Sequence, residues 1–182
     1  MLNLITVGVW AIQGIMAIVV LGLSVDLVKG QMIGDAPTTT KYGTFTGGFG
    51  LAVAIMGFAS AFIDAIPALA IMAADALSGL LLLGGGIAFV IGLRGVTCDL
   101  PEDDIGLKTL SGNSLINGGT VKIGKVNTLH EDLTFSRLLD NCRKATADQA
   151  MHFVTFGFAV ATIFLVFLVW KNGRGSRGGS HI

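Results

Sequence analysis

Four long apolar stretches constrain the fold of this chain more than any other feature of its sequence. They run from Leu4 to Val25, from Tyr42 to Ile63, from Ala65 to Leu93 and from Gln149 to Trp170. Each is long enough to cross the hydrocarbon core of a bilayer as a helix, which takes ~20 residues. A helix also satisfies its own backbone hydrogen bonds, which lipid cannot do. The sequence therefore predicts an all-α membrane protein built as a four-transmembrane-helix bundle.

The spacing of these stretches predicts the domain organisation. We expect one membrane domain over residues 1–170, with helices over about 4–28, 42–63, 65–93 and 149–170. A large loop over residues 94–148 joins helices three and four, and residues 171–182 form a flexible basic tail. Within the loop, Ile116 to Val121 resembles a hairpin with a glycine turn. Thr134 to Lys144 has the apolar spacing of an amphipathic helix that runs into the fourth span.

The composition excludes several classes of protein. The chain is 52% hydrophobic and 13% charged, with a formal net charge of zero. Such a chain is neither disordered nor a nucleic-acid binder. It contains no P-loop, dinucleotide fingerprint or nucleophile elbow, and we expect no His–carboxylate pair on one helix face inside the membrane. The sequence therefore predicts a non-enzymatic protein with no catalytic residues, no metal and no cofactor.

The two cysteines flank the large loop. Cys98 lies just after the third span and Cys142 just before the fourth. Packed ends of antiparallel helices would bring them within bonding range, and the bond would form only on the oxidising side of the membrane. The alternative is two free thiols on the cytosolic side. The spacing favours the disulfide, whereas a count of basic residues leans toward termini outside and leaves the orientation open.

Two polar residues interrupt the apolar spans. Gln13 lies in the middle of the first span, where it is expected to hydrogen-bond across helices. Asp75 is the only acidic residue well inside a span. It could bind a proton, a cation or a lipid head group. The favoured interpretation is structural, because Ala76 to Leu93 alone covers ~27 Å as a helix and leaves Asp75 near the head groups.

Two other polar features have simple interpretations. His152 starts the fourth span without a second His nearby, so a metal site there is not expected. The acidic run from Glu102 to Asp104 lacks the spacing of a calcium loop, and a solvated charge run is favoured.

Glycines recur at the spacing that lets helices approach closely in lipid. Small residues stand four apart at Gly43 and Gly47, at Gly50 and Ala54, at Ala88 and Gly92, and at Gly157 and Ala161. The run Gly84, Gly85 and Gly86 is expected to thin or loosen the third helix, where it would seat a neighbouring helix, a sterol face or a bend. Packing inside the bundle is the favoured interpretation of these glycines, and contact with lipid or another subunit is the alternative.

Two local motifs resemble a known family. Ile91 to Cys98 reads Ile-Gly-Leu-Arg-Gly-Val-Thr-Cys, and Asn141 to Ala150 carries Cys-Arg just before the last helix. This order, together with the four-span layout, resembles the fungal MARVEL-domain proteins of the non-classical export family. The resemblance implies an integral protein of the fungal plasma membrane with both termini cytosolic.

The resemblance also implies a function. Such proteins organise lateral membrane domains such as eisosome furrows, together with sterols and sphingolipids, and have been linked to unconventional secretion. Membrane lipids and other copies of the chain are then the expected partners, with bound sterol or sphingolipid in place of a cofactor and no nucleic acid. The alternatives are a small transporter or channel that uses Asp75, and an accessory subunit of a larger membrane-protein partner.

Overall fold

The structure of the protein is a computed structural model that describes residues 2–60, 62, 67–123, 126–129 and 134–177. Its elements follow in the order α1 (Leu2–Lys29), α2 (Thr38–Ser60), α3 (Ala68–Gly92), α4 (Asp104–Ser111), β1 (Thr120–Ile123), β2 (Val126–Leu129) and α5 (Phe135–Arg177). Four of these helices, α1, α2, α3 and α5, are long and apolar enough to cross a membrane. The predicted four-helix bundle is therefore confirmed, with a small β-hairpin as the departure from an all-α fold.

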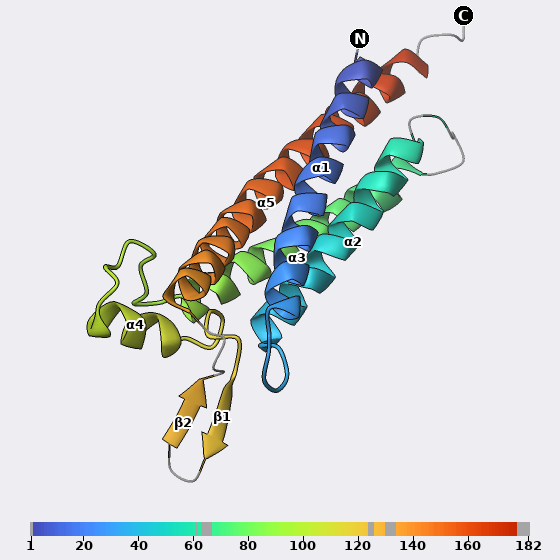
Figure 1. The fold of residues 1–182 in the computed structure, drawn as a ribbon. Helices are drawn as coiled ribbons and strands as arrows, with labels where there is room; N and C mark the ends of the chain where they lie inside the picture. Colours follow the sequence, from blue (N-terminus) through green and yellow to red (C-terminus); the bar gives the residue numbers. More distant parts are fainter. Residues whose placement is uncertain (1, 61, 63–66, 124–125, 130–133, 178–182) are drawn as a thin grey trace, which may run out of the picture.

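The four long helices form a closed ring. Helix α1 packs against α2 and α5, and α3 packs against the same two helices, so that α1–α3 and α2–α5 are the diagonal pairs. The N- and C-terminal ends lie together at one end of the bundle, and the segment from α4 to β2 covers the other end (Figure 1). We call this second end the cap end, and the segment between α3 and α5 the cap.

Helix α5 differs most from the sequence prediction. It has 43 residues, or ~65 Å, which is about twice the thickness of a bilayer core. It begins at Phe135 instead of residue 149, because Leu138, Cys142 and Ala145 continue its apolar face into the cluster that fills the cap. It also continues to Arg177, so the prediction of a flexible tail from residue 171 is wrong as far as Arg177. The loop between the spans is correspondingly shorter than predicted.

Two prolines precede helices α2 and α3. The carbonyl of Pro37 accepts the backbone N–H of Lys41 at 3.1 Å, so α2 begins at Thr38, four residues before the predicted start. Pro67 stands at the N-cap of α3 with extended backbone, one position before the first turn. Residues 61 and 63–66, where the predicted second and third helices meet, lie outside the described part of the chain.

The cap is a small folded unit tied to both neighbouring helices. The predicted disulfide between Cys98 and Cys142 is confirmed, with the two Cα atoms 5.7 Å apart. Nine buried residues fill the space beneath it: Leu27, Phe89, Leu93, Leu110, Leu115, Ile116, Leu138, Cys142 and Ala145. The acidic run is not simply a solvated charge run, because Asp103 is the N-cap of α4 and accepts the N–H of Gly106 at 2.6 Å.

The hairpin of the cap lies further along the chain than the sequence suggested. Strands β1 and β2 are antiparallel and pair Thr120 with Leu129 and Ile123 with Val126. Gly118 and Gly119 do not form the turn but precede β1 with positive φ angles of 63° and 97°. The Gly118 carbonyl accepts the backbone N–H groups of Met32 and Ile33 at 2.7 and 3.1 Å, which fixes the cap to the loop after α1.

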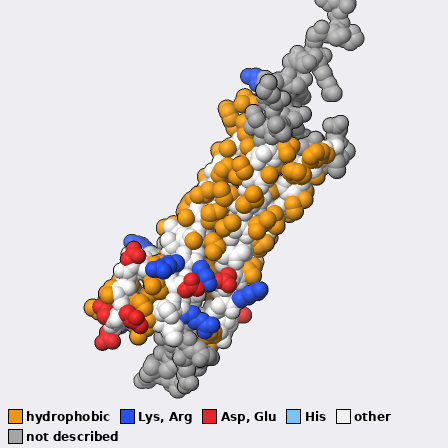
Figure 2. Space-filling model, turned by 45° about the horizontal axis from the view of Figure 1, so that its top comes forward, with side chains coloured by type: hydrophobic (Ala, Val, Ile, Leu, Met, Phe, Trp, Pro, Cys, Tyr) orange, Lys and Arg blue, Asp and Glu red, His pale blue; other side chains and the backbone are white. Residues whose placement is uncertain are grey.

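The outer surface separates apolar from charged side chains. Hydrophobic side chains cover the visible length of the bundle, and most acidic and basic side chains gather at the cap end (Figure 2). The exposed large hydrophobic residues include Ile15, Ile18, Phe45, Ile55, Leu80, Ile91, Val160 and Phe164. An apolar exterior of this size is stable only in contact with lipid, so the protein is an integral membrane protein.

Candidate functional site

The bundle interior contains two clusters of buried polar side chains. The first, which we call the Gln13 cluster, comprises Gln13, Asp75, Ser78 and Thr162, each no more than 1% exposed. The Gln13 amide nitrogen donates to Asp75 Oδ1 at 3.0 Å, and the Thr162 hydroxyl donates to Gln13 Oε1 at 2.9 Å. These bonds join α1, α3 and α5, and the bond from Gln13 to Asp75 connects a diagonal pair of helices. The predicted cross-helix role of Gln13 is confirmed.

The side chain of Asp75 faces the bundle interior. It is 0% exposed, so the described part of the chain shields it from direct contact with lipid. The other carboxylate oxygen, Oδ2, and the Ser78 hydroxyl are buried without a hydrogen-bond partner in the described part of the chain. Gln13 is therefore the side chain seen to stabilise this carboxylate.

The second cluster, which we call the His152 cluster, lies nearer the cap and comprises Ser24, Thr46, Asp148 and His152. The Ser24 hydroxyl of α1 donates to Asp148 Oδ2 at 2.5 Å. His152 Nδ1 lies 2.8 Å from the Asp148 carbonyl and 3.3 Å from Asp148 Oδ1. His152 Nε2 lies 3.0 Å from Thr46 Oγ1 of α2. This contact connects α2 to α5, the other diagonal pair.

The sequence interpretation missed this cluster. It expected no His–carboxylate pair on one helix face, yet Asp148 and His152 stand four residues apart on α5 and are both 0% exposed. The prediction was wrong because it started the fourth helix at Gln149 and left Asp148 in the loop. The i, i+4 spacing was the available signal, since residues four apart share a helix face.

The three consecutive glycines of α3 make room for neighbouring side chains within a helix that continues unbroken to Gly92. Successive helical residues point ~100° apart, so each glycine meets a different group. A Cβ on Gly84 would lie 3.3 Å from the Tyr42 hydroxyl, and one on Gly85 would lie 2.5 Å from His152 Cδ2. One on Gly86 would lie 3.0 Å from the Phe153 ring. The run therefore seats side chains of neighbouring helices, which was one of the alternatives that the sequence left open.

Most of the other predicted glycines also pack inside the protein. Gly43 lies against Ser24 and Phe89, Gly47 against the backbone of Leu21, Gly50 against Ser78 and Ala17, and Gly92 against Leu115. Gly57, which the sequence interpretation did not single out, lies directly beneath the ring of Trp10. Gly157 is different, because a Cβ there would have nothing within 4 Å and the residue is exposed. The lipid-facing alternative therefore holds for Gly157.

The contact at Gly47 leads to a prediction with a control on the next residue. A Cβ at position 47 would lie 2.7 Å from the Leu21 backbone nitrogen, whereas one at Gly48 would meet nothing within 4 Å. Both alanine variants gain the same helix propensity. We expect Gly47→Ala to lower the unfolding free energy by about 2 kcal/mol through forced separation of α1 and α2. Gly48→Ala should leave it unchanged or raise it by up to about 1 kcal/mol. Unfolding in lipid nanodiscs measures both, and equal effects would contradict the close contact.

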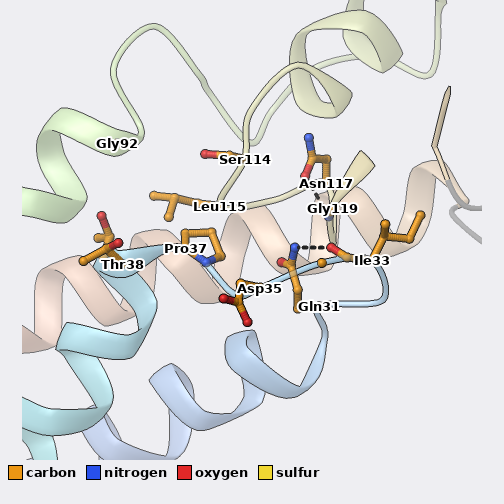
Figure 3. Close-up of a pocket in the computed structure, with 12 residues that line it drawn as sticks. Gln31, Ile33, Asp35, Pro37, Thr38, Gly92, Ser114, Leu115, Asn117 and Gly119 are labelled. Atoms are coloured by element: carbon orange, nitrogen blue, oxygen red, sulfur yellow. Dashed lines mark hydrogen bonds between the residues drawn. The ribbon is translucent and has the colours of Figure 1, made fainter. Parts of the chain in front are cut away.

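A pocket of about 570 Å³ opens at the cap end, between the loop after α1 and the part of the cap that follows α4 (Figure 3). Three of the polar side chains that line it already have partners inside the protein. The Gln31 amide nitrogen donates to the Ile33 carbonyl at 2.8 Å, and Asn117 Oδ1 accepts the N–H of Gly119 at 2.9 Å. Asp35 pairs with Lys41 at 3.5 Å. Among the described residues, no lining side chain is both buried and unpartnered, so this pocket is a joint between two loops and the buried clusters remain the candidate site.

The two clusters are suited to holding helices together and to exchanging protons. Each buries one carboxylate and supplies it with one donor from α1. Carboxylates buried inside a membrane-spanning bundle need such partners, because an unpaired charge in a low-dielectric interior is strongly disfavoured. Within the part of the chain that the structure describes, no group of three His, Cys, Asp or Glu side chains could hold a metal ion.

The comparisons with known proteins agree with this architecture. A family model described as MARVEL, membrane-associating domain, matches residues 4–165. This range includes almost all of α1, the whole of α2 and α3, the cap, and α5 as far as the Gln13 cluster. Comparisons with curated proteins and with solved structures give no match. The matched residues cover most of the chain and both buried clusters, and the chain therefore belongs to the MARVEL family of four-span, membrane-associating domains.

Proposed function

We propose that this protein organises lateral regions of a membrane by associating with copies of itself, and that it catalyses no reaction. The observation that carries the proposal is the division of its surface. The buried polar groups and most of the glycines are used for packing within the bundle, while the exterior is apolar. The clearest open small-residue face lies on α5, where Gly157 and Ala161 are both exposed and stand four residues apart. Such faces drive helix association in lipid.

The lengths of the spans support a thick, sterol-rich membrane as the environment. Helices α1 and α2 have 28 and 23 residues, or ~42 and ~35 Å. Long spans favour the thicker, sterol- and sphingolipid-rich plasma membrane by hydrophobic matching. The resemblance to the fungal non-classical export proteins supports the same location, including plasma-membrane furrows and a part in unconventional secretion.

The disulfide supports an orientation. Disulfides persist on the oxidising side of a membrane, so the bond between Cys98 and Cys142 favours a cap that faces the cell exterior or a vesicle lumen. The opposite end, where both termini lie, then faces the cytosol (Figure 1). Lys171, Arg174 and Arg177 stand at that end, but more basic residues lie toward the cap end, so the orientation rests on the disulfide and not on a count of basic residues.

Native mass spectrometry after lipid-preserving extraction tests self-association. We expect homo-oligomers that retain sterol or sphingolipid. Gly157→Leu should lower the oligomeric share about tenfold, which corresponds to ~1.4 kcal/mol of lost helix contact. Gly22→Leu is the matched control, because Gly22 of α1 is also exposed with open space around it, but Ile18 and Asp26 stand four residues away on either side, so it belongs to no small-residue pair.

Three results would contradict the proposal. The first is a monomer in the wild type. The second is an oligomer that Gly157→Leu and Gly22→Leu affect equally. The third is a fixed ratio with a larger protein, which would identify an accessory subunit instead.

A further inference from the structure

The His152 ring has one nitrogen whose proton is fixed by its partner. Nδ1 lies 2.8 Å from the backbone carbonyl oxygen of Asp148. A carbonyl oxygen only accepts hydrogen bonds, so Nδ1 carries a proton and donates it. The question left by the geometry is whether the other nitrogen, Nε2, carries a proton as well.

The partner of Nε2 can serve either state. Thr46 Oγ1 lies 3.0 Å from Nε2 and also 3.0 Å from the carbonyl oxygen of Gly43. A hydroxyl has one proton to donate and two lone pairs that accept. When the Thr46 hydroxyl donates to Nε2, the imidazole is neutral. When it donates to the Gly43 carbonyl, its lone pair can accept a hydrogen bond from a protonated Nε2, and the imidazole is then charged.

Two groups beside the ring are placed to contact its charged form. Asp148 Oδ1 lies 3.3 Å from Nδ1 and has no hydrogen-bond partner of its own. The Phe89 ring of α3 lies 5.4 Å from the imidazole, centroid to centroid, within the range of a cation–π contact. Gly85 of α3 leaves the room that the imidazole occupies, because a Cβ there would lie 2.7 Å from Nε2.

Other ionisable groups on the surrounding helices are engaged elsewhere. Asp26 of α1 and Asp140 of α5 each form an ion pair with the Lys144 ammonium at 2.6 Å. On α2, Lys41 pairs with Asp35, and the Tyr42 hydroxyl donates to the Leu81 carbonyl. On α3, Asp75 belongs to the Gln13 cluster. Asp148 is therefore the ionisable side chain seen in contact with His152 in the described structure.

We propose that His152 is a proton-binding site within the membrane domain, which takes up one proton at Nε2 while the Thr46 hydroxyl turns to the Gly43 carbonyl. His152 lies ~26 Å along α5 from the helix end at Phe135 and ~37 Å from the end at Arg177, so the cap end is the nearer one. Proton uptake places an imidazolium beside the Asp148 carboxylate at the point where α1, α2 and α5 meet. The proposal does not depend on self-association.

Nitrogen NMR on a protein with a single histidine tests this directly. The chain has three histidines, and His130→Gln with His181→Gln leaves only His152. In lipid nanodiscs titrated from about pH 8 to about pH 5, the range in which histidines change charge, we expect Nδ1 to remain protonated. Nε2 should change from an unprotonated to a protonated nitrogen.

Two variants separate proton binding from structural support. Thr46→Val removes the group that accepts from Nε2–H, and hydrogen bonds to charged donors are about twice as strong as neutral ones. We expect the ratio of charged to neutral imidazole at a fixed pH to fall about fivefold in this variant. Thr155→Val is the matched control. Like Thr46, Thr155 is fully buried, but it lies on α5 and its hydroxyl donates a hydrogen bond to the Met151 carbonyl of its own helix at 2.7 Å. It should leave the ratio unchanged.

Two outcomes would overturn the proposal. One is an Nε2 that keeps a single protonation state across the whole pH range. The other is a titration that Thr46→Val and Thr155→Val shift by the same amount, since the Thr46 hydroxyl would then have no specific part in proton binding.

Discussion

Replacing Cys98 and Cys142 together with serine is expected to lower the unfolding free energy by about 4 kcal/mol. The two residues are 44 positions apart, and releasing a closed loop of this length returns about that much conformational entropy to the unfolded chain. The cap should lose order first, because its cluster is held between the ends of α3 and α5. Thermal unfolding in nanodiscs measures the overall loss, and limited proteolysis between residues 99 and 141 measures the local one.

Reductant provides the control for this prediction. It should destabilise the wild type to the level of the double variant and have no further effect on the double variant. A wild type that resists unfolding equally well with and without reductant would mean that the bond contributes nothing, and that the nine-residue cluster alone holds the cap.

The membrane spans could be predicted from the sequence because a bilayer imposes one length and one chemistry on them. Their ends could not, because the ends depend on contacts outside the bilayer. Helix α5 starts at Phe135 since Leu138 and Cys142 pack into the cap, and no rule based on hydropathy includes that cluster. The hairpin shows the same limit: Gly118 and Gly119 have the composition of a turn, but they contact the loop after α1.

The buried site was partly predictable for a related reason. Gln13 and Asp75 stand out as polar residues in apolar runs, but their direct bond depends on which helices are diagonal in the ring, and the sequence does not give that order. Asp148 and His152 stand four residues apart, and this spacing would have indicated a shared helix face if the fourth helix had been predicted to begin before Asp148. The room for His152 comes from Gly85 on another helix, and this complementarity is visible only in three dimensions.

The two clusters have complementary positions in the bundle. The ring of packed helices leaves α1–α3 and α2–α5 as diagonals, and each cluster bonds across one of them. Because lipid supplies no hydrophobic drive between helices, such bonds help to fix which helices are neighbours and which are opposite. The polar interior can therefore specify the fold while the apolar exterior remains free for lipid and for other copies.

Gln13→Leu is expected to lower the unfolding free energy by about 3 kcal/mol, because it leaves the buried Asp75 carboxyl without its donor. Asp75→Leu alone should cost about 2 kcal/mol, since the Gln13 amide then loses its acceptor. Removing both groups should cost less than either single change, because no polar atom of the pair is left unsatisfied. Unfolding of all three variants in nanodiscs gives the coupling between the two residues.

The double variant also distinguishes a structural from a functional carboxylate. Ile12→Leu, at the partly lipid-facing position next to Gln13, is the control and should change stability by less than about 1 kcal/mol. If the double variant is stable and forms oligomers as the wild type does, Asp75 serves to pair helices, and the Gln13 cluster is part of the scaffold. Losses that simply add up would instead mean that the bond contributes nothing, and that the carboxylate is retained for a role other than packing.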